Sequence, residues 1–176
     1  MLLDIDMLIL NFFNQPFFPF LNLFFIFLIY FVYVYMLILM YIFFRTKKRK
    51  KMIHLIITSL IGIIFIYLLK YSIARPRPYL TSPDIIKTLI KSDPSFPSAH
   101  AFISFLCLYF LPKQIPKWAR YLSILYLLLL VPIGIMYIGV HYPSDIIAGA
   151  IIGFLFPKII SEDFSNRLVK RIFTGL

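Results

Sequence analysis

Residues 20–44 read FLNLFFIFLIYFVYVYMLILMYIFF, and the basic stretch RTKKRKK follows directly at residues 45–51. The first stretch carries no charged side chain and exceeds the roughly 20 apolar residues that a helix needs to cross a bilayer. We therefore predict a transmembrane helix with some excess length for tilt, which ends at the basic stretch. This segment places the chain among membrane proteins and predicts an all-α fold.

The composition of the whole chain agrees with this prediction. Of the 176 residues, 61% are hydrophobic, and the mean hydropathy is +0.91; soluble domains contain about 45–50% apolar residues. We expect one integral-membrane helical bundle, residues 1–176, with its motif-bearing core at about 52–160. Cys107 is the only cysteine, which excludes an intramolecular disulfide, and no zinc-ligand pattern occurs. A cleavable signal peptide is not expected, because Asp4 and Asp6 stand where a basic segment would begin one.

The hydropathy pattern predicts five transmembrane spans. Those after the first run from about 52 to 70, 98 to 111, 118 to 138 (with a kink at Pro132) and 143 to 160. Residues 1–19 are predicted to be an interfacial segment with a short helix at 2–13. A six-span alternative would need this segment to cross, which its acidic residues make costly.

Two further segments are predicted to be amphipathic surface helices. One begins at Ser82 and places its apolar residues on one face opposite Lys87 and Lys91. The other is the cytoplasmic tail, residues 161–176, with Phe164, Leu168 and Ile172 in one stripe.

The distribution of basic residues predicts the orientation. Six Lys and Arg residues lie in 45–51, three in 112–120 and four from 158 onward, all on one side if there are five spans. The other side carries five: Lys70, Arg75, Arg77, Lys87 and Lys91. Because cytoplasmic loops are enriched in Lys and Arg, the first side is cytoplasmic and residues 71–97 are exoplasmic. The net charge of +11 therefore reflects membrane topology, and no nucleic-acid partner is expected.

Three polar clusters are predicted to meet on the exoplasmic face. The first is His141 and Asp145, four residues apart at a helix start that Pro143 marks. A carboxylate on one ring nitrogen fixes the imidazole tautomer and leaves the other nitrogen basic. Taken alone, His141 is better explained by a plain helix start that carries a histidine, and the two other clusters reverse this preference.

The second cluster is Lys70 with Arg75-Pro76-Arg77-Pro78, and the third is Pro97-Ser98-Ala99-His100. A proline-rich stretch is stiff, and guanidinium groups bind phosphate oxygens in pairs. Lys70 alone would suit a headgroup-level lysine. Pro97 and Ser98 suit a helix N-terminus, which binds anions, whereas simple capping leaves His100 unexplained. Together the clusters indicate a histidine-based phosphoryl-transfer site. The residues alone do not decide which histidine attacks.

The clusters resemble the type 2 phosphatidic-acid phosphatase superfamily, whose signatures are K-x6-R-P, P-S-G-H and S-R-x5-H-x3-D. Lys70 to Arg77-Pro78 matches the first signature, residues 97–100 match the second with Ala99 for glycine, and His141 with Asp145 match the third. The resemblance covers about residues 52–160.

The resemblance implies that His141 is the nucleophile of a phosphohistidine mechanism, with Asp145 orienting it and His100 as general acid. It also implies that no metal or cofactor is needed and that a group of residues binds the phosphate: Lys70, Arg77, Ser98 and Ala99. The family's S-R pair falls on Gly134 and Ile135, so one phosphate-binding arginine is absent. We hypothesise that Arg75 partly fills this gap, or that the enzyme is slow.

The expected substrate is a lipid phosphate or diphosphate, with polyprenyl diphosphate slightly favoured over phosphatidic acid or phosphatidylglycerol phosphate. The alternatives are a non-catalytic relative that binds anionic lipids and a plain membrane scaffold. The sequence does not predict an oligomeric state. Gly149 and Gly153 would allow close helix packing within the chain as readily as between subunits.

Overall fold

The computed structural model describes residues 2–15 and 19–174, with side chains for residues 4–15 and 19–172. Every regular element within these residues is helical, and no strand occurs among them. The all-α prediction is therefore confirmed. The parts of the predicted N-terminal segment and tail at residues 1, 16–18 and 175–176 lie outside the described residues.

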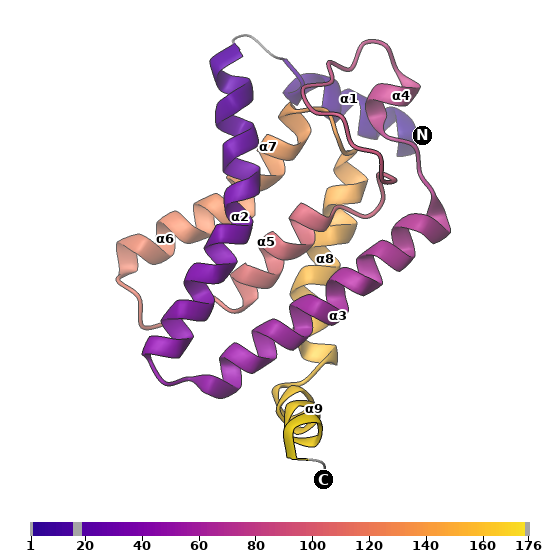
Figure 1. Cartoon of the computed structure of the whole chain (residues 1–176). Coiled ribbons are helices and arrows are strands. Elements are labelled where there is room, and N and C mark those ends of the chain that lie inside the picture. Colours follow the sequence, from indigo (N-terminus) through magenta and orange to yellow (C-terminus); the bar gives the residue numbers. More distant parts are fainter. Residues whose placement is uncertain (1, 16–18, 175–176) are drawn as a thin grey trace.

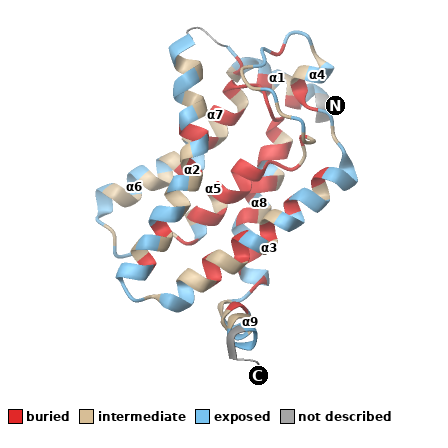
Figure 2. Ribbon diagram, viewed as in Figure 1, coloured by how far each residue is buried: buried red, intermediate tan, exposed pale blue. Residues whose placement is uncertain are grey.

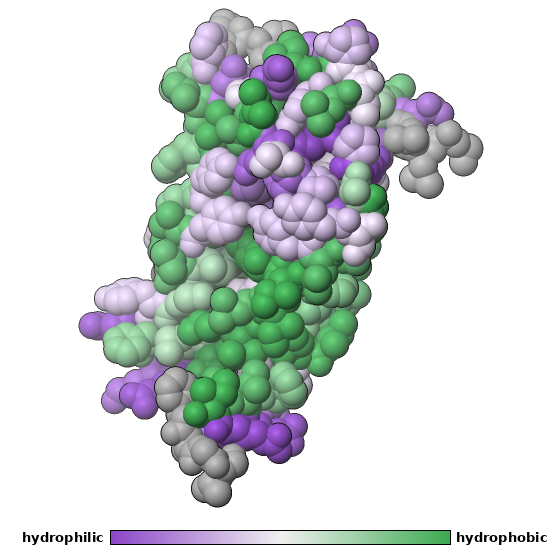
Figure 3. Space-filling model, turned by 45° about the vertical axis from the view of Figure 1, so that its right-hand side comes forward, coloured by the Kyte–Doolittle hydropathy of each residue, from purple (hydrophilic) through white to green (hydrophobic). Residues whose placement is uncertain are grey.

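The bundle is built on two long apolar helices, α2 (Pro19–Arg45) and α3 (Arg49–Ile73), which meet at the basic turn (Figure 1). Three described stretches are long and apolar enough to span a membrane: Pro19–Arg45, Arg49–Thr81 and Lys117–Tyr137. The pair α8 (Pro143–Ile159) and α9 (Glu162–Thr174), bent by 67°, counts as a fourth if it is one broken span. Polar side chains gather at both ends of the molecule around an apolar band, as expected for a multi-pass membrane protein (Figure 3).

The predicted spans correspond in position to α2, α3, α5, the α6–α7 stretch and α8. However, α5 (Ala99–Tyr109) has only 11 residues. At 1.5 Å per residue it is about 16 Å long, against a hydrocarbon core of roughly 30 Å. The third span is therefore too short to cross the membrane as a helix, and its N-terminal residues lie inside the bundle.

The fourth predicted span is irregular where the sequence predicts a kink. It consists of α6 (Lys117–Leu125), a π-helical turn η1 (Tyr126–Leu130) and α7 (Val131–Tyr137). Pro132 lacks the N–H that would continue the regular ladder of hydrogen bonds. The Ser104 hydroxyl donates to the Leu127 carbonyl at 2.6 Å, so α5 satisfies a group that the distortion leaves free.

Helix α5 lies at the centre of the bundle and is its most buried helix (Figure 2). It crosses α8 at two glycines: a Cβ on Gly149 would lie 2.3 Å from the Ser98 carbonyl oxygen, and one on Gly153 would lie 2.2 Å from that of Phe102. Within this chain, these glycines therefore let α5 and α8 approach at backbone distance. The crossing brings the start of α5 next to the start of α8.

The N-terminal helix α1 (Leu2–Phe13) lies at the same end of the molecule as the short α4 (Pro78–Thr81), and α9 lies at the opposite end (Figure 1). The predicted helices at 2–13 and in the tail are thus confirmed as helices. Asn14, directly after α1, is buried and holds the chain near residue 86.

The amphipathic helix predicted to begin at Ser82 is wrong. After α4 the chain runs without a helix as far as Ser98. The Asn14 side chain donates to the Ile86 carbonyl at 3.1 Å and accepts from the Ile86 N–H at 2.8 Å, and the Thr88 N–H reaches the Ile138 carbonyl at 3.4 Å. Because these backbone groups bond to distant parts of the chain, they do not form a helical ladder.

Candidate active site

The His141–Asp145 pair is built by the loop between α7 and α8. Pro143 is the first residue of α8, so Asp145 lies in its first turn, as predicted. Its Oδ2 accepts the Tyr142 backbone N–H at 3.0 Å and lies 3.4 Å from His141 Nδ1. Both side chains are buried. The hydrogen bond from the backbone thus helps to fix the position of the carboxylate that contacts the imidazole.

The neighbours of His141 determine its tautomer. Arg77 Nη1 lies 3.4 Å from His141 Nε2, and a guanidinium can only donate. Nε2 is therefore the acceptor, and the proton sits on Nδ1, facing Asp145. Burial lowers the pKa of His141, and the hydrogen bond to Asp145 raises it. The positive charge of Arg77 lowers it further, to about 4. The imidazole is neutral at physiological pH, with a lone pair on Nε2.

The predicted cations Lys70 and Arg77 are brought together around a third residue, Asp93. Lys70 Nζ lies 3.0 Å from Asp93 Oδ2, and Arg77 Nη2 lies 2.8 Å from Oδ1. The two cations are 1% and 2% exposed, whereas Asp93 is 20% exposed. Burial raises the pKa of Asp93, but the hydrogen bonds and charges of Lys70 and Arg77 outweigh this, so its pKa lies below the ordinary value. An ionised carboxylate therefore bridges the two cations.

Arg75 lies on the other side of Asp145. Its guanidinium donates to Asp145 Oδ1 at 2.7 Å and to Asp6 Oδ2 at 2.9 Å, and it stacks 3.8 Å from the centre of the Tyr142 ring. Ser144 links Arg75 and Asp6, because its hydroxyl oxygen accepts a hydrogen bond from Arg75 at 2.7 Å and its hydroxyl donates to Asp6. These contacts are those of a residue that holds Asp145 in place. Phosphate binding by Arg75 stays a prediction.

The third cluster opens α5 as predicted. Ser98 is the N-cap, its side chain accepts the Ala101 N–H at 3.4 Å, and its own N–H donates to the Asp145 carbonyl at 3.0 Å. That bond ties the start of α5 directly to the first turn of α8. Ala99, the first residue of α5, is buried beside it.

His100 lies among aromatic rings from α2. Its ring meets those of Tyr30 and Tyr33 edge-on, with centroid distances of 5.3 and 5.4 Å. Its buried Nε2 has no hydrogen-bond partner among the described residues. A buried ring nitrogen without a partner is costly and calls for an explanation, of which a catalytic role is one.

A neutral imidazole with a free lone pair thus lies beside a buried cation that can bind an anionic group. The family comparison agrees, since the model of the PAP2 superfamily matches residues 51–168. The chain belongs to the PAP2 superfamily.

Similar PAP2 proteins include an undecaprenyl-diphosphatase of Sulfolobus acidocaldarius, 35% identical over 108 residues, which are 61% of this chain and 52% of that protein. The bacitracin transport permease protein BcrC of Bacillus licheniformis is 34% identical over 115 residues, which are 62% of this chain and 54% of the relative. The chain thus spans about half the length of the curated relatives it matches.

Two solved structures share the fold. Aquifex aeolicus LpxE has a TM-score of 0.75 at 26% identity, covering 87% of this chain and 92% of its own. The PAP2-type phosphatidylglycerolphosphate phosphatase of Bacillus subtilis has a TM-score of 0.73 at 22% identity, covering 95% and 87%. The predicted PAP2 resemblance is therefore confirmed.

The structure explains what replaces the missing PAP2 S-R pair. A Cβ on Gly134 would lie 2.9 Å from the Ile29 side chain, so α7 packs closely on α2 there. Ile135 is fully buried in the apolar core. Both positions serve helix packing.

Three polar side chains at this PAP2 site were missed in the sequence. Ser95 is buried and donates its hydroxyl to Asp145 Oδ2. Asp93 bridges the two cations, and Asp6 reaches the site from α1. The sequence offered one indication, which is that Asp6, like Asp4, is an acidic residue within a mostly apolar helix.

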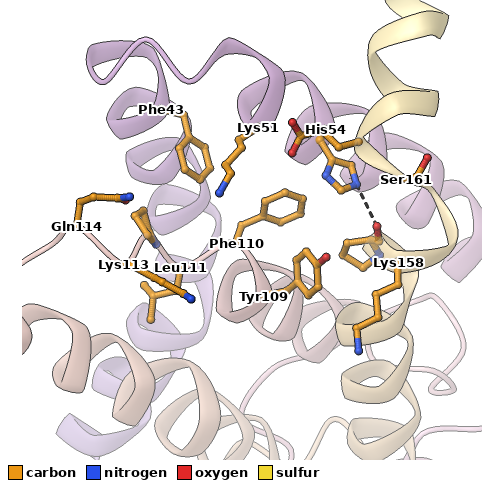
Figure 4. A pocket seen from close by; sticks show the side chains of 13 residues that line it. Phe43, Lys51, His54, Tyr109, Phe110, Leu111, Lys113, Gln114, Lys158 and Ser161 are labelled. Carbon is orange, nitrogen blue, oxygen red and sulfur yellow. Dashed lines mark hydrogen bonds between the residues drawn. The ribbon is translucent and has the colours of Figure 1, made fainter.

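A separate cavity of about 430 Å³ lies away from these groups, among the ends of α2, α5 and α8 and the start of α3 (Figure 4). Its lining includes Lys51, Lys113, Lys158 and His54. His54 is buried, and its Nε2 lies 3.1 and 2.6 Å from the carbonyl oxygens of Pro157 and Ile160. His54 thus caps the end of α8, which agrees with a structural role.

Within the described residues, no group of three or more His, Cys, Asp or Glu side chains is placed to hold a metal ion. The cations at this site are instead side chains, Lys70, Arg75 and Arg77. Metal independence stays a prediction.

Proposed function

We propose that this chain is an integral-membrane phosphatase that hydrolyses a lipid phosphate or diphosphate through a phosphohistidine intermediate. The observation that carries the proposal is the geometry of His141 in a PAP2 chain. Its Nδ1 faces Asp145, and its Nε2 lies 3.4 Å from Arg77, one of two buried cations suited to a phosphoryl group. Simple anion binding needs neither a held imidazole nor a carboxylate behind it.

In the first step, His141 Nε2 attacks phosphorus while the bond from phosphorus to the leaving oxygen breaks. His100 gives a proton to that oxygen, and Asp145 stabilises the charge that develops on the His141 ring. In the second step, water attacks phosphorus, gives a proton back to His100 and releases phosphate from Nε2. The assignment of attack to His141 rests on the family resemblance.

Binding of the phosphoryl group requires that it replace the Asp93 carboxylate. The two Asp93 oxygens form ion pairs with Lys70 and Arg77. The incoming phosphoryl oxygens would take their place, with the N-terminus of α5 at Ser98 and Ala99 as a further anion site. We expect the loop carrying Asp93 to move when substrate binds, because His141 and His100 are buried.

A lipid substrate is supported by the position of the site. The starts of α5 and α8, which carry the proposed catalytic groups, lie toward the end of the molecule that holds α1 and α4 (Figure 1), and the middle of the molecule is an apolar band (Figure 3). The basic turn at 45–51 lies toward the other end, so the positive-inside rule supports an exoplasmic site on a cell membrane. A polyprenyl diphosphate is our favoured substrate, ahead of phosphatidic acid and phosphatidylglycerol phosphate.

The test is phosphate release by the detergent-purified protein in EDTA, beside His141→Ala. The panel contains a polyprenyl diphosphate, phosphatidic acid, phosphatidylglycerol phosphate and glucose 6-phosphate. We expect metal-independent release from the lipids that vanishes in the variant. A folded wild-type protein that releases phosphate from none of them would favour a lipid-binding relative instead.

A further inference from the structure

Lys91 is held in place more firmly than a surface lysine. Its backbone N–H donates to the Tyr79 hydroxyl at 3.0 Å, and that hydroxyl donates to the Lys91 carbonyl at 2.8 Å. Its ammonium group donates to the Tyr30 hydroxyl at 2.8 Å and lies 4.9 Å from the centre of the Tyr30 ring. Main chain and side chain therefore both have partners, and the ammonium lies against α2 at the surface, where solvent can reach it.

This position places the cation beside the proposed general acid. The Tyr30 ring meets the His100 ring edge-on, with centroids 5.3 Å apart, so one aromatic ring separates the Lys91 ammonium from the imidazole. His100 Nε2 is buried and lacks a partner among the described residues. The Lys91 ammonium and the Tyr30 hydroxyl thus lie on the side of His100 that faces α2.

Hydrolysis of a monophosphate would not require the positive charge of Lys91, because other cations bind the phosphoryl group. Lys70 and Arg77 both contact Asp93, and Arg77 lies next to His141, where the attacked phosphoryl group would bind. The leaving group of a monophosphate is an alcohol. The leaving group of a diphosphate is a lipid monophosphate, which departs with negative charge that a nearby cation would stabilise.

We propose that Lys91 and the Tyr30 hydroxyl form a second phosphate subsite, which binds the phosphate that stays on the lipid when a lipid diphosphate is hydrolysed. This inference rests on the proposed function and specifies its substrate class. His141 Nε2 forms its bond to the outer phosphorus as the bridging oxygen leaves. The inner phosphate keeps that oxygen and its electron pair, beside His100 and Lys91.

A purely structural role makes a different prediction. If Lys91 only ties the loop to α2, its loss loosens the site for every substrate. A subsite for the inner phosphate affects diphosphates alone. The ratio of kcat/KM for a diphosphate and a monophosphate with the same polyprenyl tail therefore separates the two roles.

The experiment compares wild type, Lys91→Gln, Lys91→Arg and the matched control Lys87→Gln on both lipids. Lys87 is an exposed lysine of the same loop, four residues earlier. We expect Lys91→Gln to lower kcat/KM for the diphosphate about 10- to 100-fold, the range for losing a hydrogen bond to a charged group. The monophosphate should change less than about threefold, and Lys91→Arg should restore most of the diphosphate activity.

Equal losses on both lipids, or no loss on the diphosphate, would overturn the subsite while leaving the phosphatase intact. A folded wild-type protein that hydrolyses neither lipid would overturn the proposed function and the subsite with it. Thermal unfolding of each variant, measured alongside, identifies a loss of activity that comes from misfolding, which would lower kcat/KM for both lipids alike.

Discussion

Replacing Asp93 with Asn should strengthen phosphate binding while it weakens the fold. Asp93 places one oxygen 3.0 Å from Lys70 Nζ and the other 2.8 Å from Arg77 Nη2. Phosphoryl oxygens would need the same two donors. The carboxylate therefore competes with substrate, and it is ionised at neutral pH because its pKa lies below the ordinary value.

The magnitude follows from the two contacts. A hydrogen bond to a charged group contributes about 1.5–3 kcal/mol, and a neutral one about 0.5–1.5 kcal/mol. Asn keeps the shape and loses the charge, so each contact weakens by about 1 kcal/mol and the pair by about 2 kcal/mol. Since 1.4 kcal/mol is tenfold, phosphate or vanadate should bind about 30-fold more tightly, less where water screens the partly exposed carboxylate.

The assay is thermal unfolding in detergent over a phosphate titration, which needs no turnover, beside vanadate inhibition of lipid hydrolysis. Without ligand, Asp93→Asn should unfold at a lower temperature than wild type, because two buried cations lose a charged partner. The matched control is Asp84→Asn, an exposed carboxylate of the same loop, which should change neither measurement. Unchanged or weaker phosphate binding by a folded Asp93→Asn protein would refute the idea that the carboxylate occupies the phosphate site.

Three further outcomes are expected. Ser95→Ala removes a hydroxyl donor from the Asp145 carboxylate and should lower kcat about 10- to 100-fold, as for one hydrogen bond to a charged group of about 1.5–3 kcal/mol, with little change in KM for the lipid. His54→Ala leaves two carbonyl groups at the end of α8 unpaired and should cost about 1–3 kcal/mol of stability, seen in thermal unfolding, with kcat unchanged. The pKa of about 4 for His141 means that its lone pair is lost only as pH falls through that value, so the acid limb of kcat/KM assigned to His141 should lie near pH 4 and not near 6.5.

The sequence predicts what local spacing determines. Residues 20–44 predict α2 because only a membrane helix accommodates such a run, and the helix begins and ends within one residue of that stretch. The four-residue spacing of His141 and Asp145 predicts their contact because a proline starts the helix between them. The same holds for Ser98, which caps α5 as its pattern indicates.

The sequence does not predict the conformation of the 82–98 loop or the contacts that depend on it. Its apolar residues have helical spacing, yet Asn14, far away in the chain, bonds the Ile86 backbone and draws it away from a helix. Asp93 and Lys91 acquire their partners from that path. Neither residue belongs to a motif, so no spacing rule could have placed them.

An extended loop is also what the electrostatics of the site require. Lys70 and Arg77 are almost fully buried, and a buried cation without an anion costs several kcal/mol. Before substrate arrives, the chain itself must supply that anion, and the partly exposed Asp93 on a helix-free segment can supply it and withdraw. A carboxylate fixed on a rigid helix would neutralise the cations equally well but would keep phosphate out. Under the proposed function, the irregular loop would therefore reconcile a stable resting site with one that opens to a phosphate.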